Sequence, residues 1–344
     1  MRIGLIARSD NTGLGNQTME LARMLNPDKI LLIDSTSFNK NKQHPEWYQD
    51  NKFVMTVNGF PSNNQVSVFL NDLDIVISCE TFYNAAFIEL AFEKGVKTAL
   101  QYNYEFLDYL QKPHRRLPDY LIAPSLWNFD RINKLFGKKT KVIHLAPPTN
   151  EHLFADIAKN NMSKDHKRIL HVAGKAAAMD RNGTETVLEM LKYSTADYEL
   201  VITSQTPITY QYNDSRVTVS HTNPDSRETL YSGFDAMLLP RRYAGLCLPM
   251  NEALLSGLPV FMTDISPNNQ VLPGDWLVKT TKTGELMTRT MLDVHSADPK
   301  ELALLVDNYI NNKDKLIMKQ QALKIGINNF STDNLKSRYL ELFG

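Results

Sequence analysis

Short apolar runs alternate with amphipathic segments along the whole chain. The runs predict β-strands, and the segments between them carry apolar residues every three to four positions, which predicts helices. Apolar strands that alternate with helices are typical of a parallel, doubly wound sheet. In the first half of the chain the predicted strands are 2–7, 30–33, 75–78, 97–101, 120–123 and 141–144, and the predicted helices are 17–25, 84–93 and 126–136.

The alternation lapses over residues 155–168, where a polar sequence without a period predicts a linker. It then restarts, so we expect two Rossmann-like domains, at 1–158 and 169–325, facing a cleft. Ligands in such sheets bind beyond the carboxyl ends of the strands. The later predicted strands are 169–173, 200–203, 217–220, 236–239 and 259–263, followed by a mostly helical end at 299–343, and the predicted helices are 184–192 and 250–256.

Composition narrows the function classes. A length of 344 residues fits about two domains, and 38 basic against 38 acidic residues exclude a protein that coats nucleic acid through its overall charge. The two cysteines, Cys79 and Cys247, predict neither a disulfide framework nor a metal cluster and favour a reducing compartment. Because no signal-peptide core and no apolar stretch of membrane-spanning length is present, we expect a cytoplasmic protein.

A glycine-containing loop follows the first predicted strand. Gly13, Leu14 and Gly15 allow a tight turn before a helix whose free N–H groups attract an anion. The loop is not a dinucleotide fingerprint, because Thr18 stands where the third glycine would be, and it lacks the lysine of a P-loop. The alternative is a plain strand–helix turn capped by Asn16 or Thr18.

Cations and glycines gather at two strand ends of the second domain. Gly174 and Lys175 end one strand, and Arg181 opens the next helix, an arrangement that suits a diphosphate or is simply two solvated cations. After the strand 236–239, the candidates for phosphate contact are Arg241, Arg242 and the loop Gly245, Leu246, Cys247 and Leu248. In the helix that follows, Glu252 either accepts both hydroxyls of a ribose or complements the helix dipole.

Together these segments resemble the GT-B glycosyltransferases of the large retaining family four. The family motif is approximately E-G-F-G-L-P-x-x-E-A-x-A-x-G-x-P-V, and residues 244–260 run A-G-L-C-L-P-M-N-E-A-L-L-S-G-L-P-V. Residues 174–183 are similar to the family's G-R-L-x-x-E-K-G stretch, and residues 12–15 resemble its first glycine loop. The resemblance covers essentially the whole chain, and it implies a GT-B fold in which a C-terminal helix, 326–344, packs back on the first domain.

The resemblance also implies an activity: retaining transfer from a nucleotide-sugar, by family habit a UDP-sugar, with no metal strictly required. Lys175, Arg181 and Arg242 would then stabilise the departing diphosphate. The family's first motif glutamate is Ala244 here, so the donor sugar cannot be carried over. Relatives often place a histidine after the fourth predicted strand of the first domain, where this chain offers Asn103 and Glu105. Glu105 and Glu80 are candidate catalytic residues, or else capping or ion-paired groups.

The acceptor is indicated by charge and by a narrower resemblance. Segment 112–141 carries eight basic and two acidic residues, which suits nucleic-acid phosphates or anionic headgroups, or is a solvated basic face. The runs 2–18 and 240–254 resemble family-four-like enzymes of tailed, T-even-like bacteriophages. This implies transfer of glucose or arabinose to 5-hydroxymethylcytosine in double-stranded DNA, in the host cytoplasm, with an extruded base. Aromatic candidates for stacking are Tyr83, Tyr102, Tyr104 and Trp127, although core packing would also explain each.

Two other functions stay open. One is a glycosyltransferase for a surface polysaccharide, lipid or protein, which the helix 126–136 would suit through its mixture of aromatic and basic residues. The other is an inactive nucleotide-sugar-binding protein, for which Ala244 is the support. The sequence predicts no oligomeric state.

Overall fold

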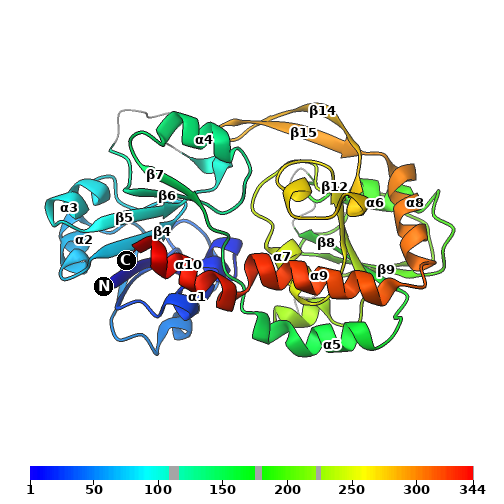
Figure 1. Ribbon diagram of the computed structural model, residues 1–344, viewed down its shortest axis with the longest axis horizontal. Helices are drawn as coiled ribbons and strands as arrows, with labels where there is room; N and C mark the ends of the chain where they lie inside the picture. Colours follow the sequence, from blue (N-terminus) through cyan, green and yellow to red (C-terminus); the bar gives the residue numbers. More distant parts are fainter. Residues whose placement is uncertain (108–115, 175–179, 222–225, 344) are drawn as a thin grey trace. The chain divides into compact units, whose positions relative to one another are not determined.

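The computed structural model describes residues 1–107, 116–174, 180–221 and 226–343 (Figure 1). The chain divides into two compact units: unit 1 comprises Met1–Thr149 and Thr332–Gly344, and unit 2 comprises Asn150–Ser331. Within the described residues, no helix combines the length and the apolar character needed to cross a bilayer.

Unit 1 is built on a seven-stranded, all-parallel sheet with the order β3-β2-β1-β4-β5-β6-β7. Its central strands are buried on both faces, which explains their continuous apolar sequences. The strands are β1 Ile3–Arg8, β2 Lys29–Asp34, β3 Val54–Asn58, β4 Ile75–Cys79, β5 Lys97–Gln101, β6 Tyr120–Ala123 and β7 Lys141–His144. The helices are α1 Gly13–Leu25, α2 Asn63–Leu70, α3 Phe87–Glu93, α4 Phe129–Phe136 and α10 Thr332–Phe343, with the 3₁₀ turns η1 Pro45–Tyr48 and η2 Tyr104–Phe106.

The last helix, α10, belongs to unit 1, where it packs against α1 (Figure 1). The buried Tyr339 hydroxyl accepts a hydrogen bond from Gln101 Nε2 at 2.8 Å and donates one to the Ala146 carbonyl at 3.0 Å. Because Gln101 also bonds Gln17 of α1, this polar network ties α10 to the centre of the unit.

Unit 2 is built on a six-stranded parallel sheet with the order β10-β9-β8-β11-β12-β13. An antiparallel hairpin, β14 Thr280–Met287 and β15 Met291–Ala297, follows it. The sheet strands are β8 Arg168–Gly174, β9 Glu199–Ser204, β10 Val217–Ser220, β11 Ala236–Leu239, β12 Val260–Thr263 and β13 Leu277–Val278. The helices are α5 Ala155–Ser163, α6 Thr184–Met190, α7 Leu248–Leu255, α8 Pro299–Ile310 and α9 Lys315–Phe330, with the 3₁₀ turns η4 Glu151–Phe154, η5 Glu228–Tyr231, η6 Asn268–Gln270 and η7 Gly274–Trp276.

The prediction of a linker at 155–168 was wrong. Most of that stretch is α5, which lies within unit 2 and packs against α9. The helix is held by a polar residue rather than by an apolar stripe: the fully buried Asn161 donates to the carbonyls of Tyr231 and Ser256, both at 2.9 Å. Hydrophobic periodicity does not register such a helix.

Both sheets contain a point at which the strand order reverses. In each, the strand order reverses between the first and the fourth strand of the unit, β1 and β4 in unit 1 and β8 and β11 in unit 2. Ligands of doubly wound sheets bind outside the carboxyl ends of the strands at this switch point. The loops after these four strands are therefore where functional residues are expected.

Candidate functional site

The predicted phosphate-binding segments of unit 2 lie at its switch point. β8 ends at Gly174, whose φ of +63° favours glycine, and β11 ends at Leu239, shortly before Arg241 and Arg242. The pairing of β8 with β11 places these two strand ends side by side. Lys175, the predicted cation after Gly174, lies outside the described residues.

Arg181 and Arg241 hold the glycine loop in place. Arg181 donates to the Ala244 carbonyl at 2.7 Å, and its guanidinium lies 4.8 Å from the centroid of the Tyr243 ring. Arg241, only 3% exposed, donates to the Gly245 carbonyl at 3.0 Å. Both cations therefore fix the backbone of the loop, and their contact with a diphosphate stays a prediction.

Arg242 differs from its neighbour Arg241 in exposure. Its backbone N–H donates to the Arg181 carbonyl at 2.9 Å, and its own carbonyl accepts from the N–H of His295 in β15 at 2.6 Å. The backbone of Arg242 is thus held from two sides while its side chain stays partly exposed. Of the two consecutive arginines, Arg242 is the better placed to meet a charged ligand.

The rest of the loop leads into a helix start. Gly245 has a φ of +133°, which an L side chain rarely adopts. Cys247 is buried and precedes α7, whereas Leu246 and Leu248 are partly exposed. The backbone N–H groups of 245–248, predicted to bind phosphate, therefore stand at the N-terminus of α7, where N–H groups and the helix dipole favour an anion.

Glu252 lies two residues further into its helix than predicted. Because α7 begins at Leu248, this carboxylate sits in the second turn and does not simply complement the start of the helix. It is buried, accepts the Tyr231 hydroxyl at 2.5 Å, and lies 3.1 Å from Arg227 Nε. The contact of this carboxylate with a ribose therefore stays a prediction.

Tyr231 and Arg227 are site residues that the sequence analysis missed. Burial and the neighbouring Glu252 carboxylate raise the pKa of Tyr231 well above its ordinary value, so the phenol stays protonated and donates to Glu252. Both residues come from the segment before β11, which carries no motif. Only the fold brings this segment to α7.

The N-terminus of α6, where the helix dipole was predicted to help bind a diphosphate, is capped by the chain itself. The carboxylate of the buried Asp180 accepts the N–H groups of Thr184 at 2.7 Å and of Glu185 at 3.0 Å, so the chain itself caps this helix. Gly183 has a φ of +75°, and a Cβ there would lie 2.3 Å from the Pro240 carbonyl oxygen. This glycine therefore allows the loop after β8 to close against the loop after β11.

In unit 1, Gly13, Leu14 and Gly15 form the first turn of α1, which begins four residues before the predicted start at Gln17. The N-cap of α1 is Thr12 rather than Asn16 or Thr18. The Thr12 hydroxyl accepts a hydrogen bond from the N–H of Gly15 at 3.2 Å. A Cβ on Gly15 would lie 1.9 Å from the Asp10 carbonyl oxygen, so this glycine serves close packing of the chain.

Asp10, another residue that the sequence analysis missed, is fully buried beside this turn. Its carboxylate accepts hydrogen bonds from Thr12 at 2.7 Å and from Ser35 at 3.1 Å, and it pairs closely with the Arg8 guanidinium. Burial alone would raise the pKa of Asp10, but the hydrogen bonds from Thr12 and Arg8 and the Arg8 charge lower it below its ordinary value. Asp10 is therefore ionised and holds the loops after β1 and β2 together.

The structure brings Glu80 and Asn103 together, while Glu105 is buried in η2. Asn103 Nδ2 donates to Glu80 Oε1 at 2.6 Å, across the carboxyl ends of β4 and β5. Glu80 has a φ of +63° and Tyr83, in the same loop, a φ of +58°. Two non-glycine residues in the left-handed region indicate stored strain, which is common at functional sites.

Three of the four aromatic residues considered for stacking belong to the interior. Tyr83, Tyr102 and Tyr104 are each at most 7% exposed. Trp127 is partly exposed, but its ring lies 5.0 Å from that of Tyr104, whose hydroxyl accepts from Arg131 at 2.6 Å. Core packing accounts for the three tyrosine rings.

The basic segment 112–141 lies mostly away from the switch point. Lys138 and Lys139 are exposed but directly precede β7, so they stand at the amino end of the sheet. Arg116, before β6, pairs with Glu89 at 2.7 Å and lies over the Phe92 ring. The remaining exposed members are Arg131, Lys134 and Lys141, and Lys112 and Arg115 lie outside the described residues.

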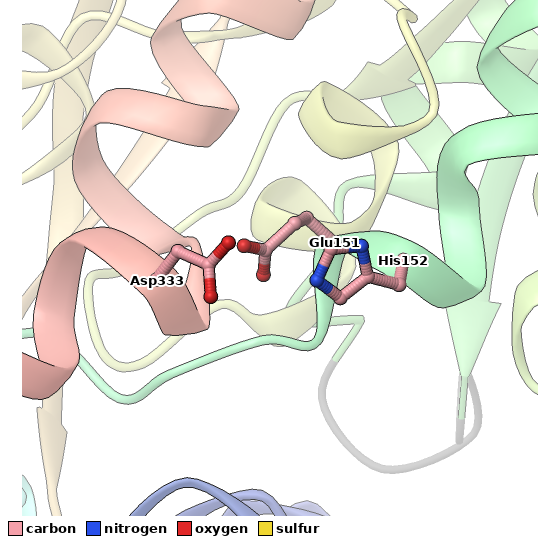
Figure 2. A group of neighbouring side chains, drawn as sticks. All are labelled: Glu151, His152 and Asp333. Atoms are coloured by element: carbon pink, nitrogen blue, oxygen red, sulfur yellow. The ribbon is translucent and has the colours of Figure 1, made fainter.

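Figure 2 shows three side chains that can each bind a metal, Glu151, His152 and Asp333, which we do not interpret as a metal centre. Glu151 and His152 are consecutive in η4 of unit 2, and Asp333 belongs to the first turn of α10 in unit 1. The three side chains therefore belong to two separate units rather than to one. A metal-independent reaction therefore remains the expectation, resting on the family resemblance alone.

No protein-family model matches the chain, and no curated protein matches it in sequence. Solved structures do match. HepE of Anabaena, in complex with UDP and glucose, is 12% identical with a TM-score of 0.68, and the match covers 99% of each chain. Sucrose-phosphate synthase of Thermosynechococcus elongatus is 12% identical with a TM-score of 0.66, covering 100% of this chain and 98% of that one.

The chain has the GT-B fold. An α-glucosyltransferase in complex with UDP matches as well, at 11% identity and a TM-score of 0.62, covering 100% of this chain and 99% of that one. The predicted GT-B architecture of two Rossmann-like domains is thereby confirmed. At these identities the likeness concerns the fold, and the chemistry has to be argued from this chain's own residues.

Proposed function

We propose that this chain is a glycosyltransferase that uses a nucleotide-sugar, with UDP as the nucleotide, and retains the anomeric configuration. One observation carries the proposal: at the switch point of a GT-B unit, Arg181 and Arg241 hold a glycine loop whose N–H groups open α7. Glu252, one turn later, offers a carboxylate for the ribose. The complexes of HepE with UDP and glucose and of the α-glucosyltransferase with UDP support a nucleotide-sugar donor.

The proposed reaction is a displacement at the anomeric carbon. The acceptor oxygen forms its bond to this carbon while the bond to the diphosphate oxygen breaks, and the departing oxygen takes the acceptor's proton. Arg242, with Lys175 and Arg181, would stabilise the charge on the diphosphate as preorganised electrostatics. Such a reaction needs no separate protein base, and Glu80 with Asn103 would orient the acceptor hydroxyl.

For the acceptor, we propose 5-hydroxymethylcytosine in double-stranded phage DNA, glucosylated or arabinosylated by an enzyme whose unit 1 binds DNA and whose unit 2 binds the donor. The support is the resemblance of runs 2–18 and 240–254 to phage enzymes. The basic excess of segment 112–141 also suits phosphates, although Lys138 and Lys139 stand at the amino end of the sheet, away from the switch point.

One observation favours a second acceptor class. Leu126 and Leu135 are 36% and 52% exposed next to Arg131 and Lys134, around α4. Apolar and basic side chains together on a helix suit an anionic membrane surface. A lipid acceptor, or a surface polysaccharide or protein, is therefore the alternative.

UDP release from a panel of UDP-sugars tests the proposal, measured with duplex DNA that contains cytosine or 5-hydroxymethylcytosine, together with mass analysis of the nucleosides. Release that needs the hydroxymethyl group, with a hexose or pentose mass added, supports both donor and acceptor. Slow donor hydrolysis that DNA does not stimulate keeps the transferase and refutes the DNA acceptor. Donor binding without any turnover indicates an inactive binding protein.

A further inference from the structure

Two phenylalanine rings are exposed at the carboxyl edge of the unit 1 sheet. Phe60 is 72% exposed and Phe38 is 45% exposed, and their centroids lie 5.8 Å apart at an interplanar angle of 34°. They follow β3 and β2, which pair in the sheet, so the fold rather than the sequence brings them together. We call Phe38 and Phe60 the ring pair.

The ring pair is continuous with the switch point. The Phe60 ring lies 6.4 Å from that of Tyr83, which belongs to the same left-handed loop as Glu80. On the other side, the Arg8 guanidinium, at the end of β1, lies 5.7 Å from the Phe38 centroid. The Phe60 ring therefore contacts the loop that carries Glu80, the residue that we assign to the acceptor hydroxyl.

In the loop that carries Phe38, neutral side chains point inward and lysines are exposed. Asn39 and Asn41 turn inward and donate to the Asp10 carboxylate at 3.1 and 3.4 Å. Between and after them, Lys40 and Lys42 are exposed. Residues 36–44 include no acidic residue, so the loop presents two cations next to an exposed ring.

We propose that the ring pair stacks on the acceptor base, unpaired from its strand, and that Lys40 and Lys42 contact the phosphates beside it. This inference rests on the proposed DNA acceptor and deepens it. A base in a duplex must leave the stack before a group on it reacts, and aromatic side chains replace the lost stacking at any base. The adjacent lysines favour an acceptor with phosphates over a neutral saccharide.

Equilibrium binding of a DNA duplex that carries 2-aminopurine at a mismatched position tests the inference. The probe's fluorescence reports stacking, and the anisotropy of a second label reports affinity. We expect Phe60→Ala to weaken binding about 5- to 150-fold and to remove the stacking signal, because one base–aromatic contact has this effect. Phe60→Trp should retain both. The matched control is Phe92→Ala, 63% exposed but in α3, which ends just before the amino end of β5.

In the double variant Lys40→Gln/Lys42→Gln, the slope of log Kd against log salt should decrease by the amount that corresponds to about two phosphate contacts. Lys97→Gln, at the start of β5, should leave this slope unchanged. Equal effects of Phe60→Ala and Phe92→Ala, or none from either, would overturn the inference. A wild-type chain that hydrolyses a UDP-sugar but binds no DNA also overturns it while sparing the transferase. Failure to bind or hydrolyse any UDP-sugar would instead remove the proposed function itself.

Discussion

A buried ion pair joins three elements of unit 2 and gives the sharpest test of how this unit is held together. The Lys319 ammonium, in α9, lies 2.6 Å from the Asp235 carboxylate before β11 and 2.6 Å from the Asn161 carbonyl of α5. The side chains of Lys319 and Asp235 are 3% and 0% exposed. We expect Lys319→Met to keep the packing of the aliphatic stem and remove only the charge.

The magnitude follows from what the substitution leaves behind. In the variant, the Asp235 carboxylate would keep the backbone N–H groups of His166 and Arg168 as donors, but no cation. Removing one partner of a buried pair costs about 3–5 kcal/mol, because the other charge stays buried and uncompensated. For a unit of this size, Asn150–Ser331, one kcal/mol shifts Tm by about 2–4 °C, so the transition of unit 2 should fall by roughly 6–20 °C.

Urea and thermal unfolding, followed by circular dichroism, measure this loss. The control is Lys315→Met on the same helix, since Lys315 also lies 2.6 Å from a carboxylate, that of Asp165, but this carboxylate is 48% exposed. It should cost about 1 kcal/mol or less. Adding Asp235→Asn to Lys319→Met should restore part of the stability, because it removes the uncompensated charge. The reasoning fails if Lys319→Met is no more destabilising than Lys315→Met.

Three further predictions concern the site and pH. Arg242→Gln should lower the rate of UDP release about 10²- to 10³-fold at saturating donor, and an equal loss in Arg23→Gln, exposed at the end of α1, would contradict this. Glu80→Gln should lower kcat/KM for the acceptor about 10- to 150-fold, because it removes one hydrogen bond to a charged group. The rate of donor hydrolysis should stay unchanged. A parallel fall in donor hydrolysis would argue against an acceptor role for Glu80. Burial lowers the pKa of His171, so below a pH of about 6.5 the unfolded chain binds a proton on this residue that the folded chain does not bind. The free energy of unfolding should therefore fall as the pH drops from 7 to 5. A urea midpoint that does not change over this range would contradict the prediction.

The geometry around His171 explains the direction of that pH effect. Its Nδ1 lies 2.9 Å from the Leu238 carbonyl, which can only accept, so Nδ1 carries the proton. Its Nε2 then accepts from the Thr184 hydroxyl at 3.0 Å. A second proton would place a charge on this fully buried ring, and the desolvation of that charge is what lowers the pKa of His171.

The sequence predicted best those elements whose burial is written into a continuous apolar run. The strands at 97–101, 120–123 and 141–144 were predicted with the bounds that the structure has. The edge strand β3 and the hairpin β14–β15 were missed because they are largely exposed, so no apolar run marks them. Helix α5 was missed because the buried amide of Asn161 replaces the usual apolar contacts.

Site residues were predicted by type but less well by orientation. An arginine beside a glycine loop can donate its hydrogen bonds either to a ligand or to the carbonyls of the loop itself. The amino-acid sequence is the same in both cases and does not distinguish them. The structure shows the second arrangement for Arg181 and Arg241. The ring pair was not foreseen, because whether a phenylalanine in a loop is buried or exposed depends on its neighbours in the fold.

The switch points of the two units share one feature, an aspartate that follows the first strand of the unit. In each unit an aspartate after the first strand takes up donors that a phosphate would otherwise use: Asp10 neutralises Arg8, and Asp180 caps α6. We therefore infer that Arg242 and the start of α7, which follow the fourth strand of the unit, are the main candidates for phosphate binding in unit 2. Unit 1 has no equivalent among its described residues, because the loop after its fourth strand presents the carboxylate of Glu80. A carboxylate repels a diphosphate but can orient a hydroxyl, so we infer that the donor belongs to unit 2 and the acceptor to unit 1.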